Sequence, residues 1–426
     1  MKLKSKLKTV VSTAIAMSVG ATMLPLSVSA ELAESAEPYA STGYYDSRDV
    51  NRDGEIDIRD VVLFNRCMVG AEYISDFKQL DADTNGIVNF ADSYCILAYT
   101  VGSSYSCSVD GLWSYTSGKV SSVPSPISAP TSAKYKKYTY ATGTTTEYTL
   151  SLPKAYTAEN SISTYTVFGD DDRKYMTNQS EFTGIVNIEL GTQDAPKVYK
   201  GTARSTGFIV GDHQIATAAH CVYNQYAGEF QYGYYFLNNP YGGNNIYLYD
   251  EDGNRTGEKI TPVEVHIPEE YYSKVSEVGS GNLPYCDYAL ITVKEDLSKY
   301  THFSLGLTKD PYAPAFSNAD IYISGIPDYA ASQDNSTAKK IAKGVGKIYT
   351  GEENNRDTVL YYNTDETNGN SGSPVYTITK YKVGNTEYCD YTAIGIVKGG
   401  NYTRNRGTRV IPLIQKFYQN NPNFSY

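Results

Sequence analysis

Short apolar runs alternate with polar breaks along the larger, C-terminal part of the chain. From about residue 166 onward, Gly, Asn and Pro interrupt these runs, and few stretches repeat at the helical period. Alternation over such short runs is typical of β-strands that bury one face. The pattern predicts a hairpin made of 207–210 and 215–221 that ends in an exposed histidine, a strand at 287–293 and a further strand running on from Pro374. We therefore expect this part of the chain to be mainly β.

Two twelve-residue segments near the N-terminus, 49–60 and 81–92, are near copies of each other. Each has oxygen-bearing side chains at positions 1, 3, 5, 9 and 12, Gly at 6 and an apolar residue at 8, and a helix-like apolar stretch follows. This is the ligand spacing of an EF-hand calcium loop, in which position 7 supplies a backbone carbonyl. The predicted ligands of two Ca²⁺ ions are Asp49, Asn51, Asp53, Glu55, Asp57 and Asp60 in the first loop and Asp81, Asp83, Asn85, Ile87, Asn89 and Asp92 in the second.

A single loop of this kind is often only a solvated turn, but two copies 32 residues apart argue against coincidence. The pair resembles a dockerin, a small α-helical two-calcium module that attaches secreted enzymes to a cohesin domain of a scaffold protein. The resemblance covers about 44–105 and implies one of two sets of cohesin contacts, which differ chemically: Ile58, Arg59, Asn65 and Arg66, or Phe90, Ala91, Leu97 and Ala98. The alternative is that Ca²⁺ only stabilises a domain with little core of its own.

The two ends of this module are flanked by segments of different composition. In 1–30, four lysines precede an apolar run, and small residues follow at 28–30, which predicts a cleaved export signal. A membrane anchor is the alternative, but the run is short and contains Pro25. We expect a secreted protein, extracellular or associated with a cell-surface scaffold, with no membrane span in the mature chain. The Ser-, Pro-, Thr- and Tyr-rich stretch 106–165 is predicted to be a linker or pro-segment.

Composition narrows the class of protein. The 426 residues are 41% hydrophobic, which is enough for a packed core, and the net charge of −10 argues against a nucleic-acid binder. The 42 tyrosines fit a strand-rich fold. The six cysteines form no CxxC pair, which argues against a zinc site, and no disulfide pairing is predicted.

Three residues of the C-terminal part have the chemistry of a nucleophilic hydrolase. A serine needs a base within hydrogen-bond reach, and that base needs a carboxylate that fixes its tautomer. The chain supplies His220, Asp287 and Ser371 in this order, with the serine in a glycine-bounded loop. The backbone N–H groups of Gly369 and Ser371 are predicted to form an oxyanion hole. Each feature alone is weak, and their joint occurrence carries the prediction.

Segments 217–221 (TAAHC) and 369–374 (GNSGSP) resemble chymotrypsin-like serine endopeptidases, and the second is similar to the V8-like, glutamyl endopeptidase branch. Segments 167–173 and 393–400 add to the resemblance, which covers about 166–426. It implies two antiparallel six-stranded β-barrels, with a triad in the cleft between them and no cofactor for catalysis. The rival interpretation is a scaffold-bound binding protein whose protease fold is inactive. If maturation cut the chain near residue 165, the dockerin-like module would leave with the pro-segment.

The chain departs from this branch at the predicted substrate pocket. Glutamate-specific members carry a histidine where this chain has Val397, followed by Lys398, and tend to have Thr where it has Glu366, next to Asp365. The resemblance thus leaves both acidic and basic P1 residues open. Two carboxylates near the base of the pocket would favour Arg or Lys, unless Lys398 neutralises one of them. Alternatively, Asp365 and Glu366 face solvent.

Overall fold

A computed structural model gives the fold of the chain. It describes residues 46–68, 80–109, 130, 132–151, 173–190, 203–223, 245–278, 282–308, 317, 319–327, 340–351, 355–367, 369–401 and 404–419. The predicted export signal at 1–30 lies outside the described residues. Among the described helices, none has the length and apolarity needed to cross a bilayer.

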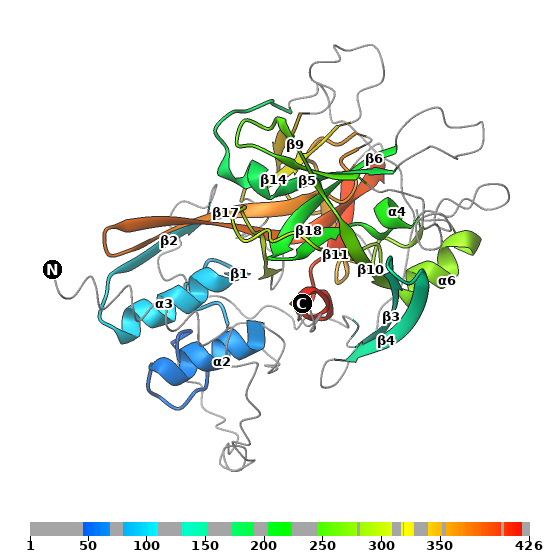
Figure 1. The fold of residues 1–426 in the computed structure, drawn as a ribbon. Helices are drawn as coiled ribbons and strands as arrows, with labels where there is room; N and C mark the ends of the chain where they lie inside the picture. The colour runs from blue at the N-terminus through cyan, green and yellow to red at the C-terminus, as the bar shows by residue number, and fades with distance from the viewer. Residues whose placement is uncertain are drawn as a thin grey trace, which may run out of the picture.

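The first sheet is antiparallel and contains the predicted hairpin. Its strand order is β4-β3-β10-β11-β7-β6-β5-β8-β9 (Figure 1). The strands and the helices connected to them are β3 (Ser132–Thr139), β4 (Thr144–Ser151), η4 (Ser180–Gly184), β5 (Ile185–Leu190), β6 (Ala203–Gly211), β7 (Gln214–Thr217), α4 (Ala219–Val222), β8 (Asn245–Tyr249), β9 (Arg255–Ile260), β10 (Pro262–Pro268), α6 (Glu269–Val278) and β11 (Ala289–Val293).

The second sheet follows in the order β15-β14-β17-β18-β19-β16, with β12 pairing β18 and β2 pairing β17. Its elements are β2 (Tyr105–Val109), β12 (Ser304–Leu305), β14 (Ile321–Gly325), β15 (Ala342–Gly346), β16 (Val359–Tyr362), β17 (Pro374–Val383), β18 (Thr386–Asn401) and β19 (Arg404–Arg409). The C-terminal helix α8 (Pro412–Gln419) follows this sheet in the chain and packs back against the first one.

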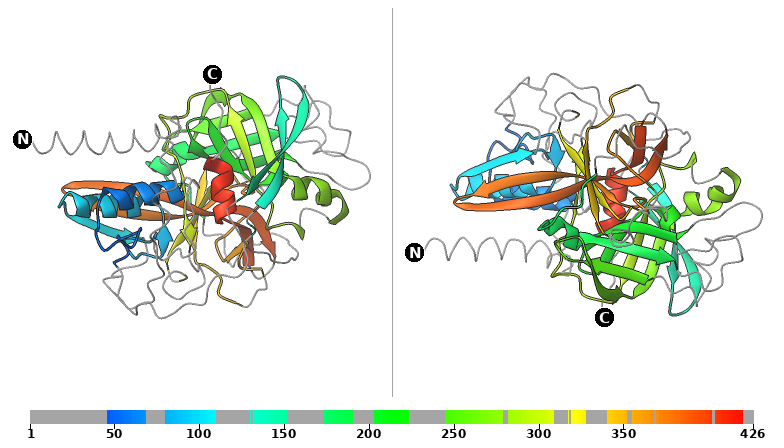
Figure 2. Two further views of the ribbon diagram at one scale, coloured as in Figure 1. Left: turned by 90° about the horizontal axis from the view of Figure 1, so that it is seen from below. Right: turned by 90° about the horizontal axis from the view of Figure 1, so that it is seen from above.

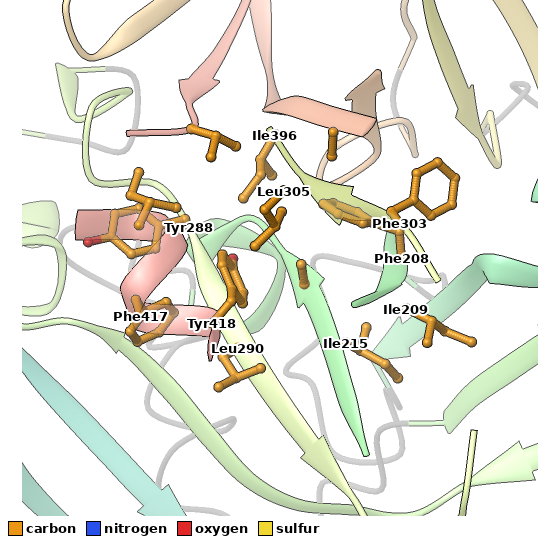
Figure 3. Packing of buried hydrophobic residues seen from close by; sticks show 14 of the residues in the cluster. Phe208, Ile209, Ile215, Tyr288, Leu290, Phe303, Leu305, Ile396, Phe417 and Tyr418 are labelled. Atoms are coloured by element: carbon orange, nitrogen blue, oxygen red, sulfur yellow. The ribbon is translucent and has the colours of Figure 1, made fainter. Parts of the chain in front are cut away.

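Aromatic side chains from distant segments fill the space between the two sheets. Phe417 and Tyr418 of α8 lie beside Tyr288 and Leu290 near β11 (Figure 3). The Tyr418 hydroxyl donates to the carbonyl of Ala289 at 2.8 Å, so the deeply buried phenol has a partner. Burial of such large rings on both sides of the boundary holds the two sheets in a fixed relation.

The prediction of a mainly β fold is confirmed, but the sheets exceed two six-stranded barrels. The nine strands of the first sheet include β3 and β4, which pair with each other and, through β3, with β10. A linker is therefore the wrong interpretation of residues 132–151. Tyr135 and Tyr138 of β3 are fully buried, and the Tyr135 hydroxyl bonds that of Tyr288 at 2.8 Å. Strand β3 therefore packs into the core of the first sheet, and β4 forms its largely exposed edge.

Residues 46–68 and 80–109, called here the N-terminal module, contain the two loop segments and the predicted helices. Helix α2 (Ile58–Met68) follows the first loop, and β1 (Ile87–Val88) and α3 (Phe90–Thr100) follow from the second. β1 pairs with β13 (Leu307–Thr308), and β2 pairs with β17. Figure 2 shows α2 and α3 against the long β17–β18 hairpin, on the side of the molecule opposite to β3 and β4. The module is thus attached to the second sheet by strand pairing.

Rings also join the N-terminal module to this hairpin. Tyr94 of α3 lies 5.4 Å from Tyr381 and 6.1 Å from Tyr388, measured between ring centroids. Tyr105 of β2 adds a contact of 6.1 Å to Tyr381. The Tyr105 hydroxyl also donates to the Ala91 carbonyl at 2.9 Å, so ring packing and a hydrogen bond both hold β2 against α3.

Candidate active site

The predicted base and its carboxylate are joined by two hydrogen bonds. His220 lies on the short helix α4, directly after β7, and Asp287 lies just before β11, which pairs with β7. The Nδ1 atom of His220 is 2.8 Å from Oδ2 of Asp287, and the His220 amide donates to Oδ1 at 2.9 Å. Asp287 is fully buried. The pair fixes the tautomer of the imidazole, with Nε2 turned away from the carboxylate.

The predicted nucleophile lies in a loop of two consecutive turns. The Asn370 amide donates to the Thr367 carbonyl, and the Ser373 amide donates to the Asn370 carbonyl. Strand β6 holds this loop, because the Thr206 amide donates to the Ser371 carbonyl at 2.9 Å and the Thr206 hydroxyl donates to the Gly369 carbonyl at 2.8 Å. The loop, which precedes β17 of the second sheet, is therefore bonded to β6 of the first sheet.

Glycines permit this close approach. Gly369 and Gly372 have φ of 93° and 83°, values that other residues rarely adopt. A Cβ atom on Gly372 would lie 2.2 Å from Thr217 Oγ1 and 3.1 Å from the amide nitrogen of Ala218, two residues before His220. The nucleophile loop therefore packs directly against Thr217 and Ala218, the segment that leads into His220. The amides of Gly369 and Ser371 alternate along the loop with those of Asn370 and Gly372, which bond to backbone carbonyls.

Burial and charge shift the ionisation of the pair. Burial alone would lower the pKa of His220, but the Asp287 carboxylate overcomes it and raises the pKa to about 9. Burial alone would raise the pKa of Asp287, but the neighbouring His220 and Lys398 charges lower it to about 2. Asp287 is therefore an anion at neutral pH that stabilises an imidazolium at His220.

The sequence of this part of the chain is similar to those of known peptidases. Residues 205–384 match the trypsin-like peptidase domain family, and this range includes all three predicted catalytic residues. The glutamyl endopeptidase of Bacillus licheniformis is 25% identical over 286 residues, which cover 65% of this chain and 75% of the relative. The chain is a serine endopeptidase. These relatives support a V8-like peptidase of the chymotrypsin fold.

Two solved structures are also similar to this chain. A Glu endopeptidase in complex with MPD has a TM-score of 0.40 and 20% identity, covering 59% of this chain and 97% of the other. Protease Anisep from Arthrobacter nicotinovorans has a TM-score of 0.35 and 14% identity, with coverages of 57% and 96%.

The residues predicted to form the substrate pocket are all buried. Asp365 and Glu366 are 3% and 0% exposed, so the alternative that they face solvent is wrong. Tyr362 donates to Oε1 of Glu366 at 2.5 Å, and burial raises the pKa of Glu366 to about 8. Val397 packs in an apolar cluster of the second sheet. Lys398 forms its ion pair with Asp287, with 3.2 Å between Nζ and Oδ2, rather than with either of the two pocket carboxylates.

Arg173 is a further residue near the nucleophile loop of the endopeptidase that sequence analysis had not singled out. Its guanidinium donates to Thr367 Oγ1 at 2.8 Å and to Asn370 Oδ1 at 3.3 Å, within the turns that precede Ser371. It is 8% exposed, and its charge acts to lower the pKa of Glu366 against the effect of burial. The only signal for Arg173 in the sequence is weak: it is the last residue of segment 167–173, which adds to the resemblance to the V8-like branch.

The two loops of the N-terminal module share one hydrogen-bond pattern. In each, the carboxylate at position 12 accepts the amides of positions 3 and 9, and the carboxylate at position 1 accepts the amide of the glycine at position 6. Carboxylate oxygens of Asp81, Asp83 and Asp92 lie within 4.8 Å of one another. Burial raises the pKa of Asp92, and the charges of Asp83 and Asp81 raise it further. In the first loop, Asp49 Oδ1 is buried without a hydrogen-bond partner among the described residues.

These features fit a hard cation such as Ca²⁺, which is held by oxygen ligands and would relieve the repulsion between carboxylates. Asn89, predicted as a ligand at position 9, differs from this expectation. Its amide oxygen accepts the Ala91 amide at 2.7 Å as a helix cap, and its amide nitrogen donates to Thr392. Position 9 commonly acts through a water molecule, which is compatible with the cap.

The two predicted docking sets differ in accessibility. Ile58 is 53% exposed, and Arg59 and Arg66 beside it are also exposed, while Asn65 is half-buried. In the second set only Phe90 is exposed, because Ala91, Leu97 and Ala98 are buried. Helix α3 lies against β2 and the β17–β18 hairpin (Figure 2), so the first set is largely accessible and most of the second set is not.

Proposed function

We propose that the chain hydrolyses internal peptide bonds through a triad of Asp287, His220 and Ser371. The observation that carries this proposal is the 2.8 Å contact between His220 Nδ1 and Asp287 Oδ2, with the Ser371 loop held on the adjoining strand. In the proposed reaction, His220 Nε2 takes the Ser371 hydroxyl proton as the oxygen attacks the substrate carbonyl. The amides of Gly369 and Ser371 stabilise the oxyanion, and His220 then protonates the leaving amine. Water hydrolyses the acyl-enzyme by the same route.

A fluorophosphonate probe tests the proposed nucleophile. Wild type is expected to be labelled and Ser371→Ala is expected to lose labelling, whereas Ser373→Ala, a matched change in the same loop, is expected to retain it. The rival function is a binding protein with an inactive protease fold. A wild-type chain that stays unlabelled after trial activation, although folded, would favour this rival.

We further propose that the N-terminal module is a dockerin that binds two Ca²⁺ ions and attaches the secreted enzyme to a cohesin. The matching hydrogen bonds of the two loops and the cluster of Asp81, Asp83 and Asp92 support the calcium sites. Exposed Ile58 and Val62 support α2 as the docking face. Isothermal titration of the full chain with a panel of cohesins tests this. We expect Ile58→Ser to abolish binding and Phe90→Ser to leave it intact.

Secretion and the P1 preference are further parts of the proposal. Reading the N-terminus of the exported protein tests cleavage after residue 30.

For the P1 preference, the buried carboxyl groups of Asp365 and Glu366, together with Val397 in place of a histidine, support Lys or Arg over Glu. Cleavage of a peptide library decides this, and equal cutting after Glu, Lys and Leu would contradict any preference based on charge.

A further inference from the structure

Lys398 reaches the carboxylate of Asp287 from the opposite sheet. Its Nζ lies 3.2 Å from Oδ2, the same oxygen that bonds Nδ1 of His220. The lysine side chain is 5% exposed and the aspartate side chain is fully buried. The carboxylate therefore accepts two hydrogen bonds, from the His220 amide and the His220 ring, and forms an ion pair with the Lys398 ammonium. A buried anion needs such partners, and removing one leaves an uncompensated charge.

A β-bulge gives Lys398 this position. The pairing of β18 with β19 shifts between Val397 and Gly399, and Gly399 has a φ of 128°, which favours glycine. A bulge bends its strand and redirects a side chain, and bulges often occur beside active sites. Val397 packs in the core of the second sheet, while the next side chain meets Asp287. Thr408 on β19 also donates to the Asp287 carbonyl at 3.1 Å, so the second sheet holds both the side chain and the backbone of Asp287.

Several charged or titratable groups face this pair. Lys398 and Asp287 act on His220 from β18 and from the segment before β11, and the Cys221 thiol acts from its own helix. The Asp287 carboxylate in turn acts on Cys286 beside it, on Arg406 of β19 and on Tyr418 of α8, and in each case its charge favours a higher pKa. Among these groups, Lys398 is the cation that contacts the carboxylate directly.

We propose that Lys398 is a positioning residue of the catalytic apparatus, which holds the Asp287 carboxylate toward His220 and sets the pH at which the imidazole becomes a neutral base. This rests on the proposed triad. An imidazolium beside Asp287 is favoured by the carboxylate and opposed by the ammonium, since like charges repel at this distance. Lys398 thus keeps His220 neutral at a lower pH than Asp287 alone would allow.

The pH dependence of kcat/KM for Lys398→Met tests the role. A base must be neutral to accept the serine proton, so activity falls on the acidic side of the His220 pKa. Without the ammonium we expect this acidic limb to move upward by about one pH unit. Lys398→Gln, which keeps a hydrogen-bond donor but no charge, is expected to move it the same way, and Lys398→Arg is expected to retain the wild-type limb.

A matched control removes a different buried lysine. Lys343 is 6% exposed and ion-paired with Glu181, and Lys343→Met is expected to leave the limb unchanged even if it lowers the melting temperature. If Lys398→Met loses activity with its limb in place, the residue is only structural and the proposal is wrong. Where the methionine variant does not fold, the glutamine variant decides in the same way.

Proton NMR of the full chain gives a second readout that does not depend on turnover. The chain has four histidines, so the His220 resonances are assignable by comparison with a His220→Gln variant. Its titration is expected to shift upward in Lys398→Met, and an unchanged titration overturns the proposal. If Ser371→Ala retained fluorophosphonate labelling, the proposed nucleophile would fail, but this titration would still judge the role of Lys398.

Discussion

The side-chain amide of Asn89 donates a 2.9 Å hydrogen bond to Oγ1 of Thr392, 303 residues later in the chain. Both side chains are fully buried. Asn89 also caps α3 in the N-terminal module, and Thr392 lies on β18, the strand that carries Lys398. The second loop is therefore bonded directly to a strand that leads to the catalytic pair.

Calcium is expected to stabilise the whole described fold and not only the N-terminal module. At 100 to 1,000 times its Kd, each of the two proposed Ca²⁺ ions should add about 3–4 kcal/mol to the free energy of unfolding. Because β1 pairs with β13 and Asn89 bonds Thr392, calorimetry should show one transition that moves several degrees upward with Ca²⁺ and downward with EDTA.

The hydrogen bond to Thr392 provides the control for this coupling. Thr392→Val leaves the buried Asn89 amide without its partner and should cost about 1–3 kcal/mol, whereas Thr392→Ser keeps the hydroxyl. A separate early transition that alone responds to Ca²⁺ would contradict the coupling.

Cutting the chain between the β3–β4 hairpin and the peptidase body should not separate the two pieces. A protease recognition sequence inserted between residues 151 and 173 allows a specific cut. Three strand pairings (β1 with β13, β2 with β17, β3 with β10) join the N-terminal piece to the rest. We expect both fragments to elute together from a sizing column in native buffer and apart in urea. The module would then not leave when the chain matures near residue 165.

Tyr135→Ala tests whether packing holds the cut pieces together. This ring stacks on Phe417 with 4.5 Å between centroids, and loss of a large buried ring costs about 3–5 kcal/mol. The cut variant should then release the N-terminal fragment more readily. Release of that fragment from the otherwise unmutated cut chain would show that the pairings are too weak to retain it.

Gly372→Ala is expected to abolish activity and lower stability by a few kcal/mol. The added Cβ would lie 2.2 Å from the Thr206 carbonyl oxygen, at a φ of 83°. Gly384→Ala is the matched control, because Gly384 also has a positive φ but has nothing within 4 Å of the added atom. That variant should lose about 1–2 kcal/mol and keep full activity in a peptide assay. Equal effects of the two substitutions would refute the steric explanation.

The preference for a basic P1 residue is expected to rise with pH. Burial raises the pKa of Glu366 to about 8, so its carboxyl is neutral below that pH and anionic above it. The ratio of kcat/KM for Lys and Leu substrates should increase across this range, because ionisation of His220 cancels in the ratio. Glu366→Gln should flatten the increase. A ratio that does not change with pH in the wild-type enzyme would show that Glu366 does not contact the P1 side chain.

Local patterns predicted much of the fold and site. Two kinds of motif are local enough to be visible in a single sequence. The first is the ligand spacing of the loops at 49–60 and 81–92, and the second is the short segments around His220, Asp287 and Ser371. Helices α2 and α3 and the His220–Asp287 contact follow these predictions.

Long-range pairing explains what was not predicted. The β3–β4 hairpin pairs with a strand more than a hundred residues away, and its Tyr135 and Tyr138 show no clear alternation. Lys398 was expected in the pocket because it follows Val397 in a segment that resembles the pocket wall of the V8-like branch, and the bulge at its position has no sequence signature apart from Gly399. Arg173 meets the Ser371 loop only through the tertiary fold.

Strand pairing between β1 and β13 has a consequence for catalysis on an assembly. If a long flexible linker joined the module to the enzyme, the enzyme could occupy many positions around the docking point. The effective concentration of substrates would then depend on the length of the linker. Here a partner bound to α2 would hold the residues around His220 and Asp287 in one orientation relative to the assembly. The proteins cleaved would then be those whose exposed segments reach these residues in that orientation, so geometry of the assembly would select them as much as sequence does.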